Sequence, residues 1–258
     1  MSGEIRIEVT EAPATGRVAR LTIAHERKLN TLNADLMREF IAACDRLARD
    51  EALRAVVVTG AGEKAFIGGA DINEMAAVKN GAAARDFITL VHGCCRAVRD
   101  IPVPVIGRIN GWTLGAGLEL AAACDLRISA DSVRFGMPEV VVGIPSVVEA
   151  ALLPGLIGWG RTRRLLLLGE RIDAAEAERW GFLEKVVPAT ALDAAVEEWL
   201  GLIGAAGARA VRIQKRLIRQ WEDLPLAQAV AAGIPAFASA WETDEPQRLM
   251  GHFLHRPR

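Results

Sequence analysis

The first half of the chain alternates between hydrophobic patterns typical of strands and of helices. Residues 6–9 and 17–24 predict two strands joined by the turn-rich sequence APATG. Residues 55–60, AVVVTG, form a short apolar strand of the kind that a parallel or doubly covered sheet uses. A further strand at 101–109, IPVPVIGRI, contains two prolines, which confine its start to a sheet edge or to the point where the chain enters the sheet.

Helices are predicted between these strands and throughout the C-terminal part. One begins near Asn33, a residue type that caps helix N-termini well, and a second covers roughly 83–99. Apolar residues of the first recur at helical spacing on one face: Leu36, Phe40, Ala43 and Leu47. After residue 150 helical patterns dominate up to about Gly251. We therefore predict an α/β core at 1–200 and a helical region at 201–258.

Two stretches of the predicted core share one layout, in which an apolar strand leads into a glycine-containing loop and then into a helix. They cover 55–75, AVVVTGAGEKAFIGGADINEM, and 103–124, VPVIGRINGWTLGAGLELAAAC. Each loop ends where a helix begins, so free backbone N–H groups and a positive helix end can face one space and bind negative charge. Neither loop has the glycine spacing of a P-loop or of a dinucleotide-binding turn. Taken alone, each is more often a tight turn than a binding site.

Composition and charge exclude several classes of partner. The 258 residues are 51% hydrophobic, and 31 basic against 32 acidic residues give a formal net charge of −1. This balance provides no overall field toward nucleic acid or an anionic membrane, so we expect neither as a partner. No window approaches the roughly 20 apolar residues of a transmembrane helix. The N-terminal sequence also lacks the apolar centre of a signal peptide.

The cysteines indicate a reducing compartment. Their spacing fits no metal site, and we expect reduced, packed thiols at Cys44, Cys94, Cys95 and Cys124. These features together predict a cytoplasmic protein without a metal site.

Acidic residues are the remaining candidates for chemistry. The sequence lacks the Gly-x-Ser-x-Gly pattern, and its histidines are scattered, so His92 is expected to be packed or solvated rather than catalytic. Glu119 lies in the apolar segment GLELAAACDL, where burial would raise its pKa toward neutrality, as a general acid or base requires. Glu139 follows a proline in FGMPEVVVGIP. The alternative is that Glu119 occupies a helix surface and Glu139 an ordinary loop.

Several ordered motifs resemble the enoyl-CoA hydratase/isomerase, or crotonase, family. They are KAFIGGADINEM at 64–75, INGWTLGAGLELAAACDLRISAD at 109–131 and FGMPEVVVGIP at 135–145, and the likeness extends to RKLNTLN at 27–33 and GERIDAAEAERWGFLEKVVP at 169–188. The resemblance implies the α/β crotonase fold, a ClpP-like spiral of repeated ββα units. It also implies that the helical C-terminal region builds trimers, and often hexamers as dimers of trimers.

The resemblance further implies an acyl-CoA site with no cofactor beyond the coenzyme A of the substrate. Backbone N–H groups of Ala70 and Ala116 would form an oxyanion hole for the thioester oxygen. Glu119 and Glu139 would flank a water that adds to a 2-enoyl-CoA, giving a 3-hydroxyacyl-CoA, or would catalyse the reverse dehydration. The residues implied for CoA binding are Arg27, Lys28, Leu29, Lys64, Ala70, Asp71 and Ile72. Each basic residue among them could equally be an ordinary solvated charge.

Departures from the family pattern leave alternatives open. Isomerases and thioester hydrolases of this family often lack one of the two acids, so keeping both favours hydration over these activities and over a non-catalytic CoA-binding or scaffold role. After GIP, the segment SVVEAALLPGLIGWG differs from fatty-acid hydratases, which leaves the acyl group undefined. Glu149 in this segment is either a third acid that reaches the acyl group or a first-turn helix carboxylate, and the structural interpretation is favoured.

Overall fold

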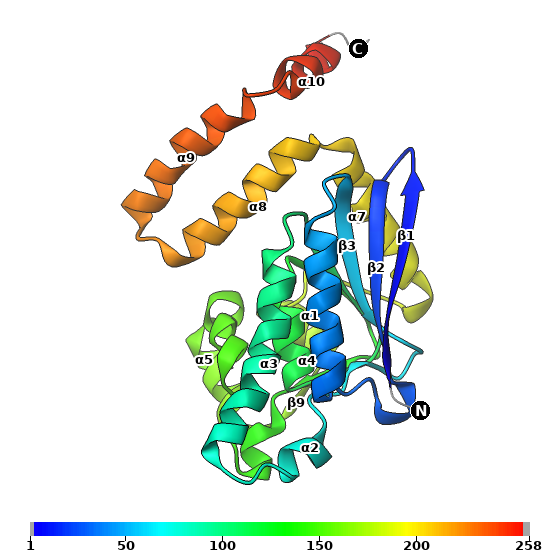
Figure 1. The fold of residues 1–258 in the computed structure, drawn as a ribbon, viewed down its shortest axis with the longest axis vertical. Coiled ribbons are helices and arrows are strands. Elements are labelled where there is room, and N and C mark those ends of the chain that lie inside the picture. The colour runs from blue at the N-terminus through cyan, green and yellow to red at the C-terminus, as the bar shows by residue number, and fades with distance from the viewer. Residues whose placement is uncertain (1–2, 255–258) are drawn as a thin grey trace.

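The computed structural model describes residues 3–254, whose strands form two sheets (Figure 1). The larger sheet has the strand order β1-β2-β3-β5-β7-β10. Its strands are β1 (Glu4–Ala12), β2 (Gly16–Ala24), β3 (Leu53–Gly60), β5 (Val105–Ile109), β7 (Leu126–Ala130) and β10 (Lys185–Val187). The smaller sheet, in the order β4-β6-β8-β9, consists of β4 (Ala65–Ile67), β6 (Trp112–Leu114), β8 (Arg134–Gly136) and β9 (Arg171–Asp173). Residues 1–2 and 255–258, which the predicted core and C-terminal region include, lie outside the described residues.

Helices connect and cover the sheets. The α-helices are α1 (Ala34–Ala48), α2 (Ile72–Ala76), α3 (Gly81–Asp100), α4 (Ala116–Ala123), α5 (Leu153–Leu168), α6 (Ala174–Trp180), α7 (Leu192–Ala205), α8 (Ala208–Asp223), α9 (Leu226–Ala240) and α10 (Glu245–Leu254). Short 3₁₀ helices are η1 (Glu26–Lys28), η2 (Pro138–Val142), η3 (Val148–Leu152) and η4 (Ala189–Ala191). The predicted start of α1 is confirmed, because the Asn33 side chain accepts a hydrogen bond from the Leu36 N–H at 2.8 Å.

The chain passes from one sheet to the other in successive turns of strand, strand and helix. β3 belongs to the larger sheet and β4 to the smaller, and β5–β6 and β7–β8 repeat this step. Strands of successive turns pair in parallel, β3 with β5 and β5 with β7 in one sheet, β4 with β6 and β6 with β8 in the other. Parallel neighbours need long crossover connections, which the helices provide. The predicted spiral of ββα units is confirmed.

The two prolines of the segment 101–109 precede β5 rather than lying within it. Pro102 and Pro104 stand before Val105, the first residue of the strand. β5 is an interior strand between β3 and β7, where a proline would remove a ladder hydrogen bond. The carbonyl of Pro104 still accepts from the Val56 N–H at 2.9 Å, so the prolines lead the chain into the sheet.

The pairing of β4 with β6 brings the two glycine loops together. Parallel strands end at the same edge, so the segments that follow Ile67 and Leu114 open into one space. A Cβ on Gly117, at the start of α4, would lie 2.1 Å from the carbonyl oxygen of Ile67. Glycine at this position therefore lets the first turn of α4 pack directly on β4.

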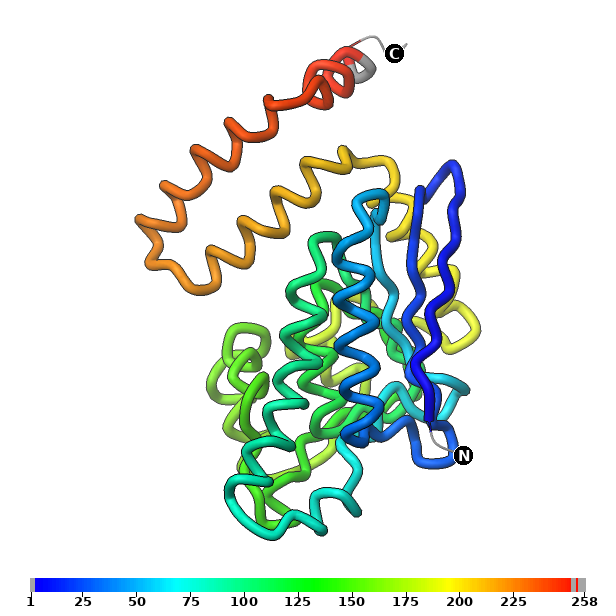
Figure 2. The backbone as a smooth tube through the Cα atoms, viewed as in Figure 1, coloured from blue at the N-terminus to red at the C-terminus, as the bar shows by residue number. Residues whose placement is uncertain are grey.

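The C-terminal helices extend away from the sheets (Figure 2). α7 still packs on β3, β5 and β7, and it contains residue 200, so the division of the chain at that residue stays a prediction. α8 is joined to the core by the buried Lys215, whose Nζ donates to Asp125 at 2.6 Å and to the Val103 carbonyl at 2.9 Å. Within residues 3–254, no helix combines the length and apolar character needed to cross a membrane.

Candidate active site

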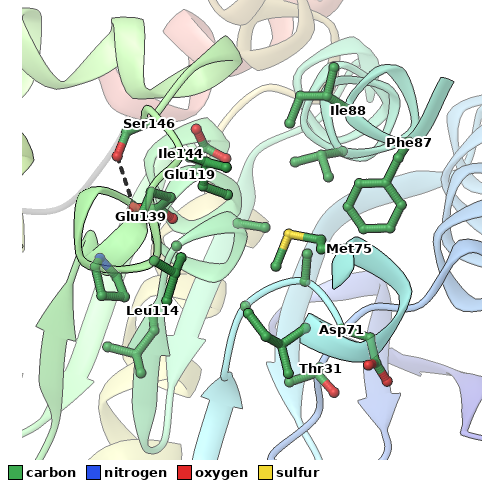
Figure 3. A pocket seen from close by; sticks show the side chains of 18 of the residues that line it. Thr31, Asp71, Met75, Phe87, Ile88, Leu114, Glu119, Glu139, Ile144 and Ser146 are labelled. Carbon is green, nitrogen blue, oxygen red and sulfur yellow. Dashed lines mark hydrogen bonds between the residues drawn. The ribbon is translucent and has the colours of Figure 1, made fainter. Parts of the chain in front are cut away.

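A cavity of about 880 Å³ lies where the glycine loops meet α2, α3 and η2 (Figure 3). Most of the residues predicted for the site line it: Arg27, Lys28, Leu29, Ala70, Asp71, Ile72, Ala116, Glu119 and Glu139. Lys64 does not line it. The Lys64 side chain is exposed just before β4. The backbone carbonyl oxygen of Lys64 accepts a hydrogen bond from the Trp112 N–H at 3.0 Å. The structure thus brings together residues that are up to 112 positions apart in the sequence.

Two residues that line the cavity, Ala70 and Ala116, have unpaired backbone amides within residues 3–254. Leu32 forms a parallel bridge with Ala70: the Leu32 N–H donates to the Gly69 carbonyl, and the Leu32 carbonyl accepts from the Asp71 N–H. The bridge does not use the Ala70 N–H. Ala116 is the first residue of α4, where a helical N–H has no intrahelical acceptor. Within residues 3–254, neither amide donates to a protein acceptor. The helix end adds partial positive charge at Ala116, so these groups can stabilise an oxyanion.

Glu119 is buried in the first turn of α4, with 4% of its surface exposed. Its Oε1 accepts a hydrogen bond from the Ala150 N–H at 3.1 Å. Burial, and after it the nearby negative charge of Glu139, raise the pKa of Glu119 to about 8 against the opposing hydrogen bond from the Ala150 N–H. The side chain therefore faces the cavity rather than a solvated helix surface, and it holds a proton at neutral pH.

Glu139 lies beside Glu119 but is held differently (Figure 3). It belongs to η2 and is half-buried, and its Oε2 accepts from the Ser146 hydroxyl at 2.8 Å. A Cβ on Gly115 would lie 2.5 Å from the Glu139 Oε1, and Gly115 has a φ of +52°. This glycine both permits the turn into α4 and leaves room for the carboxylate.

The basic residues at the cavity differ in whether their charge is paired within the protein. The Nζ of Lys28 forms an ion pair with Asp71 at 2.7 Å, and this hydrogen bond, acting against burial, lowers the pKa of Asp71 to about 2. Asp71 also caps α2 by accepting from the Asn73 N–H at 2.9 Å. Arg27 lines the cavity and has no ion-pair partner within residues 3–254. Part of the positive charge of Lys28 is therefore already neutralised by the protein.

The wall opposite the two glutamates is apolar and was not predicted from the residues of the sequence. Met75 of α2 and Phe87 and Ile88 of α3 project from this side (Figure 3). Phe87 and Ile88 lie in the helix predicted at 83–99, and Met75 ends the motif at 64–75. Apolar residues of a helix are by themselves indistinguishable from ordinary core packing. Ser146, the partner of Glu139, was missed as well, because a lone serine in a loop carries no specific signal.

Glu149 lies next to the cavity without lining it. It is 7% exposed in η3, and its Oε1 lies 2.8 Å from the Nδ1 of His92 on α3. Burial raises the pKa of Glu149, and the charge and hydrogen bond of His92 oppose that shift. His92 is solvated on one side, as predicted, but also bonds this buried carboxylate.

Comparison with known proteins identifies the family. The chain matches the enoyl-CoA hydratase/isomerase family over residues 14–257. It belongs to this family. Enoyl-CoA hydratase/isomerase relatives include the short-chain-enoyl-CoA hydratase of Clostridium acetobutylicum, which is 34% identical over 93% of this chain and 92% of its own length. The crotonyl-CoA hydratase of Syntrophomonas wolfei is also 34% identical, with the same coverage of both chains.

Solved structures of the family share the fold. The crystal structure of an enoyl-CoA hydratase from Bacillus anthracis superposes with a TM-score of 0.89 at 34% identity, and the match covers 97% of this chain and 96% of that one. The chain therefore has the crotonase fold of the enoyl-CoA hydratase/isomerase family along almost its whole length.

Proposed function

We propose that this protein is an enoyl-CoA hydratase, which adds water across the double bond of a 2-enoyl-CoA to give a 3-hydroxyacyl-CoA. The observation that carries the proposal is that two residues with unpaired amides, Ala70 and Ala116, line the same cavity as the two glutamates. Isomerisation or thioester hydrolysis does not require a pair of acids at a water site. The hydratases named among its relatives support the same reaction.

The amides of Ala70 and Ala116 activate the substrate. Both N–H groups donate to the thioester oxygen, which becomes more negative as an enolate-like state forms. This interaction draws electrons from the double bond and makes the β-carbon electrophilic. Loss of one such donor typically raises the barrier by about 3 to 4 kcal/mol.

The glutamates exchange protons with water and substrate. Two neighbouring carboxylates do not both ionise readily, so the pair keeps one proton at neutral pH, consistent with the pKa of about 8 for Glu119. The ionised glutamate takes a proton from the water as the water oxygen bonds to the β-carbon. The protonated member gives a proton to the α-carbon as the π bond breaks. The pair ends with the proton count it began with, so no cofactor is consumed.

The acyl group and the CoA moiety occupy different sides of the cavity in this proposal. Met75, Phe87 and Ile88 favour an apolar acyl chain, because a charged acyl group would lose hydration against them. Arg27 and Lys28 lie where phosphate groups of CoA can pair with them, with Arg27 the less neutralised of the two. Leu29 and Ile72 provide apolar contact for the same moiety, and Lys64 serves only a part of CoA that extends beyond the cavity.

Assembly into trimers, or hexamers as dimers of trimers, belongs to the same proposal. Large apolar side chains lie exposed along α9: Leu226 (80%), Val230 (67%), Ile234 (74%) and Phe237 (70%). A contiguous apolar surface of this kind is usually covered by a partner. A cytoplasmic location is supported by four cysteines that are all free and buried.

A panel of acyl-CoA substrates tests the function. The purified protein is incubated with crotonyl-CoA and with branched, aromatic and long-chain 2-enoyl-CoA thioesters, and loss of the conjugated double bond is followed together with product mass. We expect a mass gain of one water with apolar enoyl groups. Absence of water addition with every thioester would refute the proposal.

A further inference from the structure

The strongest unexplained feature outside the cavity is the 3₁₀ helix η3, which packs between α3 and α4. Its first residue, Val148, has a φ of +40°, a left-handed conformation that β-branched residues rarely adopt. Such strain persists only where surrounding interactions impose it. The next two residues, Glu149 and Ala150, make those interactions.

Glu149 joins η3 to α3. Its Oε1 lies 2.8 Å from Nδ1 of His92, whose side chain is 46% exposed, whereas the Glu149 side chain is 9% exposed. The other oxygen, Oε2, is fully buried and has no hydrogen-bond partner within residues 3–254. A buried carboxylate with one unpaired oxygen is costly, so a role beyond packing is expected for it.

Ala150 joins η3 to α4. Its N–H donates to two acceptors, the Val147 carbonyl at 2.9 Å and Glu119 Oε1 at 3.1 Å. The residue that carries this donor directly follows Glu149 in the chain. Movement of the Glu149 side chain would therefore displace the group that orients Glu119.

We propose that Glu149, anchored by His92, is a positioning residue that holds the Ala150 N–H on Glu119 and adds negative charge beside it. The inference rests on the proposed hydratase function, because it assigns a role toward an acid of that reaction. Neither Glu149 nor His92 lines the cavity, so the proposed role of both is indirect. The negative charge of Glu149 contributes to the raised pKa of Glu119.

The titratable groups around Glu149 come from the neighbouring elements. Those of α3 are His92 and the thiols of Cys94 and Cys95, whose pKa values burial raises so that both stay neutral, and Cys95 lowers the pKa of Glu149 slightly. From α4 comes Glu119, which also faces Glu139 of η2. The arginines of α5 are engaged elsewhere: Arg161 with the Trp180 carbonyl, Arg163 with the Trp159 ring and Arg164 with Glu170. His92 is therefore the basic side chain that contacts Glu149 among the described residues.

Glu149→Gln tests the proposal, because it keeps the shape of the side chain and removes its charge. We expect kcat for crotonyl-CoA hydration to fall about tenfold, with KM changed less than about twofold, since the acid is misplaced while substrate contacts remain. Removing a negative charge favours ionisation of Glu119, so the loss of activity at high pH should move to lower pH. Glu197→Gln, an exposed charge removal on α7, is the control and should leave both values unchanged.

Two further measurements keep the test decisive. His92→Asn removes the anchor at the surface and should lower kcat without raising KM, even if Glu149→Gln fails to fold. Infrared titration of the protonated carboxyl, assigned by its loss in Glu119→Gln, should show the same downward shift in Glu149→Gln without turnover. An active wild-type protein with an unchanged kcat, pH profile and infrared titration in these variants would overturn this inference alone. A wild-type protein that hydrates no enoyl-CoA would instead overturn the proposed function.

Discussion

The two glutamates at the cavity stand in regions that are built in opposite ways. Glu119 belongs to α4, whose residues are all buried and whose first turn packs on β4 through Gly117. Glu139 belongs to η2, where the three following valines, Val140, Val141 and Val142, are exposed. One acid is therefore fixed by the core, and the other is carried by a surface segment.

As a result, different interactions determine the protonation of Glu119 and the position of Glu139. Burial is the largest of the effects that raise the pKa of Glu119 to about 8, so its protonation depends chiefly on the core. Among the described residues, the Glu139 carboxylate accepts from one side chain, the Ser146 hydroxyl at 2.8 Å. Changes near Glu119 should therefore alter proton affinity, whereas changes near Glu139 should alter mainly the position of the carboxylate.

The largest expected effect comes from removing either acid. Glu119→Gln and Glu139→Gln should each lower kcat for crotonyl-CoA hydration by at least about a hundredfold, the usual scale for loss of a general acid or base. Amides of the same size cannot exchange the proton that the reaction requires. Steady-state kinetics with Glu197→Gln as the control would measure this effect. Near wild-type activity in both variants would show that the carboxylates do not carry the reaction.

A smaller loss of kcat is expected from changing Ser146, the hydrogen-bond donor to Glu139. Ser146→Ala removes the donor to Glu139 and should reduce kcat by about fivefold, which corresponds to a typical hydrogen bond of about 1 kcal/mol. Ser146→Thr keeps a hydroxyl and should restore part of the loss. Ser132→Ala, at an exposed loop position, is the matched control. Equal kcat values for Ser146→Ala and wild type would mean that Glu139 is held by the backbone of η2 alone.

Sequence reasoning predicted elements whose signals are local. α1 was found from the cap at Asn33 and the spacing of its apolar residues, and the structure confirms both. The strands β4, β6 and β8 have three residues each and were not identified from the residue pattern. Their stability comes from parallel pairing with segments far away in the chain, so a window of sequence contains little of the signal. The second sheet was expected only through the family resemblance.

The candidate site follows the same rule. Burial of Glu119 was predicted from its apolar neighbours and is confirmed. The pairing of Lys28 with Asp71, 43 positions away, was not predicted, because both residues were assigned to CoA separately. The contact between His92 and Glu149 spans 57 positions and was missed for the same reason. Ion pairs between residues far apart in the sequence can be identified only once the fold is known.

Reaction in isotopically labelled water tests the central claim most directly. Crotonyl-CoA is incubated with the protein in deuterated water enriched in a heavy oxygen isotope, and the product is analysed by mass spectrometry and NMR. The account predicts heavy oxygen in the hydroxyl group on the β-carbon and one deuterium on the α-carbon, with the thioester intact. Heavy oxygen found only in a free carboxylate, or a shifted double bond without solvent oxygen, would contradict it.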